Sequence, residues 1–342
     1  MEIVDPDRLL PILRILMAPG MRSAAAARLL RAFGGDPDRV LAASRDALAS
    51  VQGVGPALAS ALAEAAPGAA EAEGEAARAR DMGISLVGPG DPGYPLPLVH
   101  TFDPPPLLYA RGAWMPGDVV AVAVVGSRRA SAYGTIQAGR LARGLAEAGV
   151  TVVSGLARGV DAAAHRGALE APDGRTVAVL GSGLAKPYPF ENLSLLDRVA
   201  ARGAVFSEFP LDAPPLPANF PRRNRVLAAL SLATVVVEAA EGSGSLITAR
   251  LAAELGKDVA ALPGRVDAEG SRGANRLLKE GAALVEGAAD VIDLLDGLHI
   301  EEAVIGGLSM GGYVTLGIFR HAPRYFSGMV LVGAPTSTIP LK

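Results

Sequence analysis

Short hydrophobic runs rich in valine dominate the chain from residue 119 onwards. A turn with glycine or serine and then a helix-length segment follow each run, and the runs in order are VVAVAVVGS, VTVVSG, RTVAVLGSG, GAVFSE, LATVVVEA, DVAALPG and AALVEG. Continuously hydrophobic strands that alternate with helices indicate a parallel sheet covered by helices on both faces. The pattern therefore predicts an α/β fold class, with a Rossmann-like domain over residues 113–297.

The N-terminal part of the chain has a helical pattern instead. Apolar positions within residues 1–70 recur three and four residues apart, and glycine- and proline-containing turns separate them, which predicts a small helical domain. Its segment VQGVGPALASALAEA, residues 51–65, fits half of a helix-hairpin-helix motif, whose helix amides hold a phosphate, and fits a plain helical turn equally well. Residues 71–112, which are partly proline-rich, are predicted as a linker that ends in an edge strand.

The composition narrows the possible chemistry. At 342 residues and 50% hydrophobic content, the chain is long enough for one full core and a second small domain. The absence of cysteine excludes disulfides, thiolate nucleophiles and cysteine-based zinc sites, and with only four histidines we expect no metal and no cofactor. The acidic first residues and the lack of a long apolar stretch predict a cytoplasmic protein that does not enter a membrane. A net charge of −3 argues only mildly against a polyanionic partner, so the local distribution of charge has to decide.

Three turns are unusually rich in glycine and serine, at residues 126–129, 154–159 and 242–246. In an open parallel sheet such turns lie beyond the carboxyl ends of the strands, where their amides can face an anion. None of them has the G-x-G-x-x-G spacing with a following acid that is typical of NAD binding, and the Walker A sequence is absent too. Three such turns on one predicted edge favour phosphate binding over tight packing alone.

The segment PLPANFPRRNRVLAALSLA, residues 215–233, contains three arginines and no acid. Guanidinium groups pair with phosphates, and an exposed ring at Phe220 would offer a stacking face to a base. The alternative is a helix with a solvated basic face and Phe220 in the core. Arg128, Arg129 and Arg158 on the glycine turns favour the first interpretation, because together with this segment they would form a positive groove.

Several acidic residues and one histidine are candidates for acid–base chemistry. Asp161 and His165 are four residues apart on one helical face, and we predict that Asp161 caps the helix while His165 packs or contacts a ligand phosphate. Glu208 and Glu238 end predicted strands and would suit either the general acid or base of an N-glycosidic cleavage or a buried hydrogen-bonding role. No nucleophile stands beside any of them, so we assign no catalytic residue.

Residues 298–342 are predicted as a separate tail that includes the G-x-S-x-G spacing of a nucleophile elbow around Ser309. The tail resembles the elbow strand, helix and next strand of an α/β-hydrolase. Its one histidine after the serine, His321, would lie along the elbow helix, so no catalytic triad can assemble. We therefore expect a non-functional fragment that is loosely packed.

Several long motifs occur in an order that resembles the DNA-processing protein A (DprA) family of bacterial natural transformation. They are VVGSRRAS with YG (124–134), VSGLARGVDAAAHRGAL (153–169), GSGL with YPFEN (181–192), FSEFP (206–210), NFPRRNRVLAALS (219–231) and VVVEA with GSGSLITARLAAELGKDVAALPG (235–264). The similarity covers most of residues 1–296. It implies a helical sterile-alpha-motif-like domain followed by a Rossmann-like core, a homodimer, no enzymatic activity, and a recombination mediator that binds single-stranded DNA, protects it and loads RecA recombinase.

In that family the arginine of the G-S-R turn and the F-P-x-R-N-R segment contact DNA. Members often have a lysine just before that phenylalanine, whereas this chain has Pro217 and Ala218, so one phosphate contact is either missing or moved to Arg223. From the turns and the family motif together, the predicted DNA-binding residues are Arg128, Arg129, Ser154, Gly155, Arg158, Phe220, Arg222, Arg223, Asn224, Arg225, Ser243, Gly244 and Ser245. The alternative function is a nucleotide-processing enzyme similar to a phosphoribohydrolase, with Glu208 or Glu238 as the acid.

Overall fold

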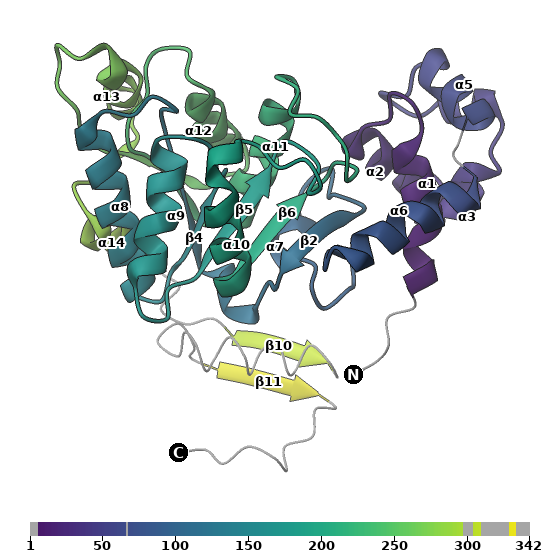
Figure 1. The fold of residues 1–342 in the computed structure, drawn as a ribbon, viewed down its shortest axis with the longest axis horizontal. Helices are drawn as coiled ribbons and strands as arrows, with labels where there is room; N and C mark the ends of the chain where they lie inside the picture. The colour runs from purple at the N-terminus through teal and green to yellow at the C-terminus, as the bar shows by residue number, and fades with distance from the viewer. Residues whose placement is uncertain (1–5, 66–67, 297–303, 309–327, 333–342) are drawn as a thin grey trace. The chain divides into compact units, whose positions relative to one another are not determined.

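The computed structural model describes residues 6–65, 68–296, 304–308 and 328–332. The chain divides into two compact units, each built from several segments. Unit 1 consists of residues 1–113, 155–157 and 177–230, and unit 2 of residues 114–154, 158–176 and 231–342. Figure 1 shows the helices and strands with the labels used below.

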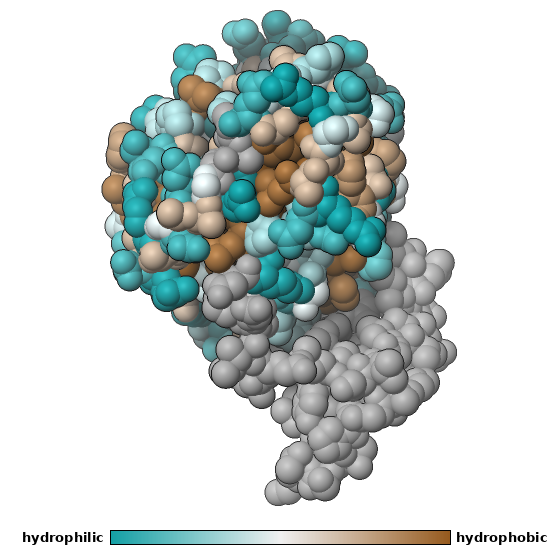
Figure 2. Space-filling model, turned by 90° about the vertical axis from the view of Figure 1, so that its right-hand side faces the viewer, coloured by the Kyte–Doolittle hydropathy of each residue, from teal (hydrophilic) through white to brown (hydrophobic). Residues whose placement is uncertain are grey.

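Unit 1 begins with a group of short helices, as the helical spacing predicts. They are η1 (Pro6–Leu9), α1 (Leu10–Met17), α2 (Ser23–Ala32), α3 (Pro37–Leu41), α4 (Arg45–Ala49), α5 (Pro56–Ala65) and α6 (Ala69–Asp81). Their core contains Ile15, Leu29, Val40, Leu48 and Leu62, which are all buried. Figure 2 shows the face of the molecule on the side of these helices, where mostly hydrophilic residues surround a central group of hydrophobic ones.

Unit 1 also contains four strands of the sheet, in the order β1 (Ser85–Val87), β2 (Leu108–Gly112), β6 (Ala204–Ser207) and β5 (Thr176–Leu180). The pairs β1–β2 and β2–β6 are antiparallel, and β6–β5 is parallel. The other helices of this unit are α7 (Leu96–Val99), η3 (Phe190–Asn192), α10 (Leu193–Arg202) and α11 (Asn219–Leu230). The predicted linker at 71–112 thus contains most of α6, all of α7 and the two strands β1 and β2. Its last strand, β2, is not an edge strand, because β2 lies between β1 and β6 and the edge of the sheet is β1.

Unit 2 contains five parallel strands, in the order β4 (Thr151–Ser154), β3 (Ala121–Val125), β7 (Ala233–Val236), β8 (Asp258–Ala261) and β9 (Ala283–Leu284). Its helices are η2 (Pro116–Val119), α8 (Ala132–Glu147), α9 (Val160–Glu170), α12 (Gly244–Glu254), η4 (Glu269–Ser271), α13 (Arg272–Lys279) and α14 (Ala288–Asp296). All seven predicted strands of the valine-rich pattern are present in the two units, and their parallel pairing is as predicted.

Helices cover both faces of the strands in unit 2. Val122 and Val124 of β3 belong to a buried cluster with residues of α8, α9 and α14. Val125 of the same strand belongs to a second cluster with Ala249 of α12 and Ala274 of α13. Successive side chains of a strand point to opposite faces, so a continuously hydrophobic strand supplies both cores. The predicted mixed α/β fold, a mostly parallel sheet flanked by helices, is confirmed.

The C-terminal residues that the structure describes are two short strands. Strands β10 (Val304–Leu308) and β11 (Gly328–Val332) pair in parallel, with Val304 opposite Gly328. Ser309 and His321 of the predicted elbow lie outside the described residues, so the expectation of a non-functional tail stays a prediction. Within the described part of the chain, no helix has both the length and the apolar character needed to cross a bilayer.

Candidate nucleic-acid interface

The first predicted phosphate turn follows β3 in unit 2. Arg128 and Arg129 are exposed there, and the main-chain N–H of Arg129 donates to Ser127 Oγ at 3.1 Å. The main-chain N–H of Ser127 donates to the carbonyl of Glu238 at 2.7 Å, which fixes the turn to the end of β7. The backbone of the turn is therefore fixed by hydrogen bonds, while the side chains of Arg128 and Arg129 are exposed.

Glu238 has a structural role in holding this turn. Its buried carboxylate accepts hydrogen bonds from Ser131 N at 3.0 Å and from Ser131 Oγ at 2.5 Å. Ser131 in turn is the N-cap of α8, since its hydroxyl accepts a bond from Gly134 N at 3.0 Å. The carboxylate connects the end of β7 to the start of α8, which matches the hydrogen-bonding alternative for Glu238 rather than the acid–base one.

The second turn, after β4, packs onto the first. Gly159 has a φ of +71°, and a Cβ there would lie 2.2 Å from the carbonyl oxygen of Ser127, so only glycine fits. Val160 N donates to the same carbonyl at 3.1 Å. Arg158 is exposed on this turn, whereas Ser154 is fully buried and its hydroxyl donates to the carbonyl of Val124 at 2.7 Å. Ser154 is among the predicted DNA-binding residues of this turn, and the structure leaves neither its backbone nor its side chain facing solvent.

The third turn starts α12. Ser243 is its N-cap, and its hydroxyl lies 2.8 Å from the buried hydroxyl of Ser245 and accepts a longer bond from Ser245 N at 3.4 Å. Gly244 is exposed. The two serine hydroxyls thus contact each other at the start of the helix, and the predicted contacts between the amides of this turn and DNA stay a prediction.

Helix α11 in unit 1 carries the predicted arginine segment, but its arginines point in different directions. Arg222 is exposed. Arg223 is only 4% exposed, and its guanidinium donates to the carbonyl of Val179. A Cβ at Gly155 would lie 2.0 Å from Arg223 Nη1, so this glycine leaves room for the buried guanidinium. Asn224 is also buried. The structure therefore places Gly155, Arg223 and Asn224 in the packing beneath the surface, and their predicted DNA contacts stay untested.

Phe220 occupies an intermediate position. Its ring is partly buried and lies edge-on to Tyr188, with 6.2 Å between the ring centroids and an angle of 62° between the planes. This contact fixes the orientation of the ring while part of it stays accessible, so stacking on a base and packing are both compatible with its position.

Arg225 and Glu208 form an ion pair whose carboxylate side chain is 4% exposed. Glu208 also accepts a hydrogen bond from Ser23 Oγ at 2.6 Å, and Arg225 Nη1 donates to the carbonyl of Asp103 at 2.6 Å. The carboxylate thus has cationic and hydroxyl partners, as the hydrogen-bonding alternative for Glu208 expects, and Arg225 is engaged inside unit 1.

Asp161 and His165 lie buried in α9. The N-cap residue of α9 is Gly159, whereas Asp161 lies in the first turn, so the prediction that Asp161 is the cap residue is wrong. His165 Nδ1 is 2.7 Å from Thr176 Oγ1, and that hydroxyl donates to the carbonyl of Val152 at 2.7 Å. His165 packs inside unit 2, which confirms the packing alternative for this residue.

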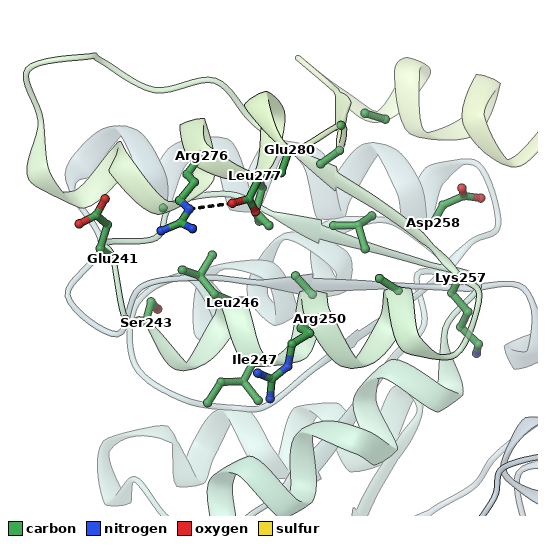
Figure 3. Close-up of a pocket in the computed structure, with 18 residues that line it drawn as sticks. Glu241, Ser243, Leu246, Ile247, Arg250, Lys257, Asp258, Arg276, Leu277 and Glu280 are labelled. Atoms are coloured by element: carbon green, nitrogen blue, oxygen red, sulfur yellow. Dashed lines mark hydrogen bonds and ion pairs between the residues drawn. The ribbon is translucent and has the colours of Figure 1, made fainter.

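Two pockets differ in their charge. The pocket in Figure 3, about 740 Å³, lies in unit 2 between α12 and α13. Leu246 and Leu277 line its apolar part, and its charged lining balances Arg250, Lys257 and Arg276 against Glu241, Asp258 and Glu280. Arg276 is paired with Glu280 at 2.7 Å, and burial lowers the pKa of Lys257 to about 8. This balance of charge does not favour a polyanion.

A second pocket, of about 540 Å³, lies within unit 1, and its charged lining consists of four arginines and one carboxylate, Glu208. Sequence reasoning missed its N-terminal wall around Arg22, because no motif marks that residue.

No group of three or more His, Asp or Glu residues suited to a metal occurs among the residues that the structure describes.

A mostly parallel sheet flanked by helices, with exposed arginines on the turns that follow its strands, defines a Rossmann-like α/β protein. Residues 85–296 match the family model of the DNA recombination-mediator protein A. The chain belongs to that family. The matched region ends before the tail, so the predicted α/β-hydrolase likeness gains no support from it.

Curated relatives include Protein Smf of Escherichia coli, 46% identical over 208 residues that make up 60% of this chain and 55% of that protein. The DNA processing protein DprA of Streptococcus pneumoniae is 42% identical over 202 residues, which are 59% of this chain and 71% of that protein. The chain spans only part of the length of these curated relatives. It covers 55% of the Smf protein of Escherichia coli, 59% of that of Synechocystis and 51% of a putative DprA of Mycobacterium tuberculosis.

Two solved structures of the family have the same fold. The X-ray structure of DprA from Streptococcus pneumoniae is 33% identical and covers 83% of this chain and 97% of its own, with a TM-score of 0.71. A structure of DprA from Helicobacter pylori that concerns its single-stranded DNA binding mode is 33% identical and covers 62% of this chain and 95% of its own, with a TM-score of 0.56.

Proposed function

We propose that this protein binds single-stranded DNA and acts as a recombination mediator in natural transformation. The family membership and the single-stranded DNA binding described for the Helicobacter pylori relative support this role. Protection of incoming strands, loading of RecA and assembly into a homodimer belong to the same proposal, as does a cytoplasmic location where internalised DNA is met.

The observation that carries the proposal is the exposure of arginines on rigidly held turns. Arg128, Arg129 and Arg158 of unit 2 face solvent on two turns that are hydrogen-bonded to one another. Arg222 of unit 1 is exposed at the start of α11. Guanidinium groups on a fixed backbone neutralise phosphates at a small cost in conformational entropy. Each set is proposed by itself as a contact to single-stranded DNA.

The mechanism combines three kinds of contact. The arginines neutralise phosphates, the exposed backbone near Gly244 donates hydrogen bonds to them, and the accessible part of Phe220 stacks on a base, which is worth about 1–3 kcal/mol per base. Since none of these contacts reads the edge of a base, we expect little dependence on base sequence. The buried Ser154, Arg223, Asn224 and Ser245 hold the turns in place and do not touch DNA.

We assign no enzymatic step to this protein. The two acids that a nucleotide-processing reaction would use have structural partners, Arg225 and Ser23 for Glu208 and Ser131 for Glu238. Incubation with nucleoside monophosphates should therefore release no free base, and release of base that Glu208→Gln or Glu238→Gln abolishes would contradict this assignment.

The proposal is tested by measuring the affinity for a fluorescent oligo-dT and for a duplex of the same length. Arg128→Ala and Arg222→Ala should each weaken oligo-dT binding several-fold, with the wild type favouring the single strand. Arg140→Ala, which removes an exposed arginine from α8, and Arg80→Ala, which does the same on α6, are the matched controls. Equal affinities for all five proteins would overturn the proposal.

A further inference from the structure

The 540 Å³ pocket of unit 1 brings the N-terminal helices into the predicted interface. Its walls come from the end of α1 and the start of α2, from the loop after β6 and from the start of α11. Arg22 and Arg222 therefore line one pocket although they are far apart in the sequence. The volume lies in the range of about 300–1,000 Å³ that is usual for small-molecule sites.

The charges that line the pocket are only partly compensated. Arg28 donates from Nε and Nη2 to Asp103 Oδ2 at 3.1 and 3.0 Å, and Arg225 is paired with Glu208. Arg22 and Arg222 are exposed, and neither has an ion-pair partner among the residues that the structure describes. The pocket thus keeps two uncompensated positive charges, which favours an anionic ligand.

The backbone at the start of α2 adds to this charge. Arg22 is the N-cap residue of the ten-residue helix α2, with an extended backbone at φ −126° and ψ 144°. The Arg22 side chain makes no capping hydrogen bond, and the first turn of the helix contains no acid. The amides of that first turn, at Ser23 and Ala24 on the pocket wall, favour a negative charge for the same reason as the arginines.

The remaining wall is apolar. Met21, Phe209, Pro214 and Leu216 line it, and Leu216 is 52% exposed. An inorganic anion would make no contact with these apolar side chains, whereas a nucleotide would place its sugar and base against them. A ligand that combines one phosphate with an apolar sugar and base, as a nucleotide unit does, matches both walls of the pocket.

We infer that this pocket binds one nucleotide unit, with its phosphate between Arg22 and Arg222 and its sugar and base along Phe209 and Leu216. Arg22 is then a DNA-contacting residue that the N-terminal helices contribute. The inference rests on the proposed function and extends it. The same chemistry suits a unit of a bound strand or a free mononucleotide, and the experiment separates these two sources.

The test compares the full-length wild type with Arg22→Ala, Arg22→Lys and the control Arg80→Ala. Binding of oligo-dT is followed by fluorescence anisotropy over a range of salt concentrations, and binding of dTMP by calorimetry. Arg22→Ala should weaken oligo-dT binding about three- to ten-fold and lower the slope of log affinity against log salt by about 0.7, the contribution of one phosphate on a single strand. Arg22→Lys should restore most of the slope, and Arg80→Ala should match the wild type.

The outcomes separate this inference from the proposed function. If Arg22→Ala loses oligo-dT affinity, the ligand is a unit of the strand, and if it loses only dTMP binding, the ligand is a free nucleotide; both support the pocket. If wild type binds oligo-dT and Arg22→Ala binds both ligands equally well, the pocket is overturned and the proposed function stands. If wild type binds no oligo-dT, the proposed function fails, and the dTMP measurement still decides about the pocket.

Discussion

Replacing Arg225 with methionine should destabilise the protein more than a surface substitution does. The change leaves the carboxylate of Glu208, whose side chain is 4% exposed, with the hydroxyl of Ser23 as its remaining partner in the contacts described above. It also removes the donor to the carbonyl of Asp103. Breaking a buried ion pair costs about 3–5 kcal/mol. Because the Arg225 side chain is 25% exposed and water reaches it, we expect the lower end, about 3 kcal/mol.

Thermal unfolding followed by circular dichroism at pH 7 measures this loss. At roughly 2–4 °C per kcal/mol, the midpoint should fall by about 6–12 °C. The double variant Arg225→Met/Glu208→Gln removes both charges and should recover more than half of the loss. Arg111→Met breaks the exposed pair with Asp197 in the same unit and should cost less than about 1 kcal/mol. A loss for Arg225→Met no larger than that control, or a double variant as unstable as the single one, would refute the reasoning.

Three further predictions concern packing, pH and the tail. Gly155→Ala places a methyl group against the buried guanidinium of Arg223 and should cost about 1–3 kcal/mol in urea unfolding; an unchanged midpoint would contradict that packing. Since burial lowers the pKa of Lys257 from 10.5 to about 8, the unfolded chain binds more protons between these values, so stability should rise across that pH range and Lys257→Met should abolish the rise. A fluorophosphonate probe should leave Ser309 unlabelled in mass spectrometry.

The sequence predicts the strands well because their physical signal is local. A run such as AVAVV in β3 is hydrophobic at every position, and only a strand covered on both faces uses every one of those side chains. The helices between the strands follow from the same alternation. The segment 71–112 carries a weaker signal, because its strands are short and proline separates them. The pairing of β2 with β6 depends on residues far away in the sequence.

The candidate site was predictable only in part. Arg223 lies on the same face of α11 as Val226, Leu227 and Leu230, which follow it by three, four and seven residues. This spacing indicates that Arg223 is buried, whereas the arginine-rich composition of the segment favours an exposed basic face. The roles of Glu238 and Arg22 had no such signal. Glu238 contacts Ser131 across 107 residues, and Arg22 lines a pocket with Arg222 only after unit 1 has folded.

The most direct test of the central claim is the salt dependence of oligo-dT binding by the wild type and by the triple variant Arg128→Ala/Arg158→Ala/Arg222→Ala. If the exposed arginines neutralise three phosphates, the slope of log affinity against log salt should become shallower by about 2 in the variant, at about 0.7 per phosphate. A triple variant that keeps both the wild-type slope and the wild-type affinity would contradict the account.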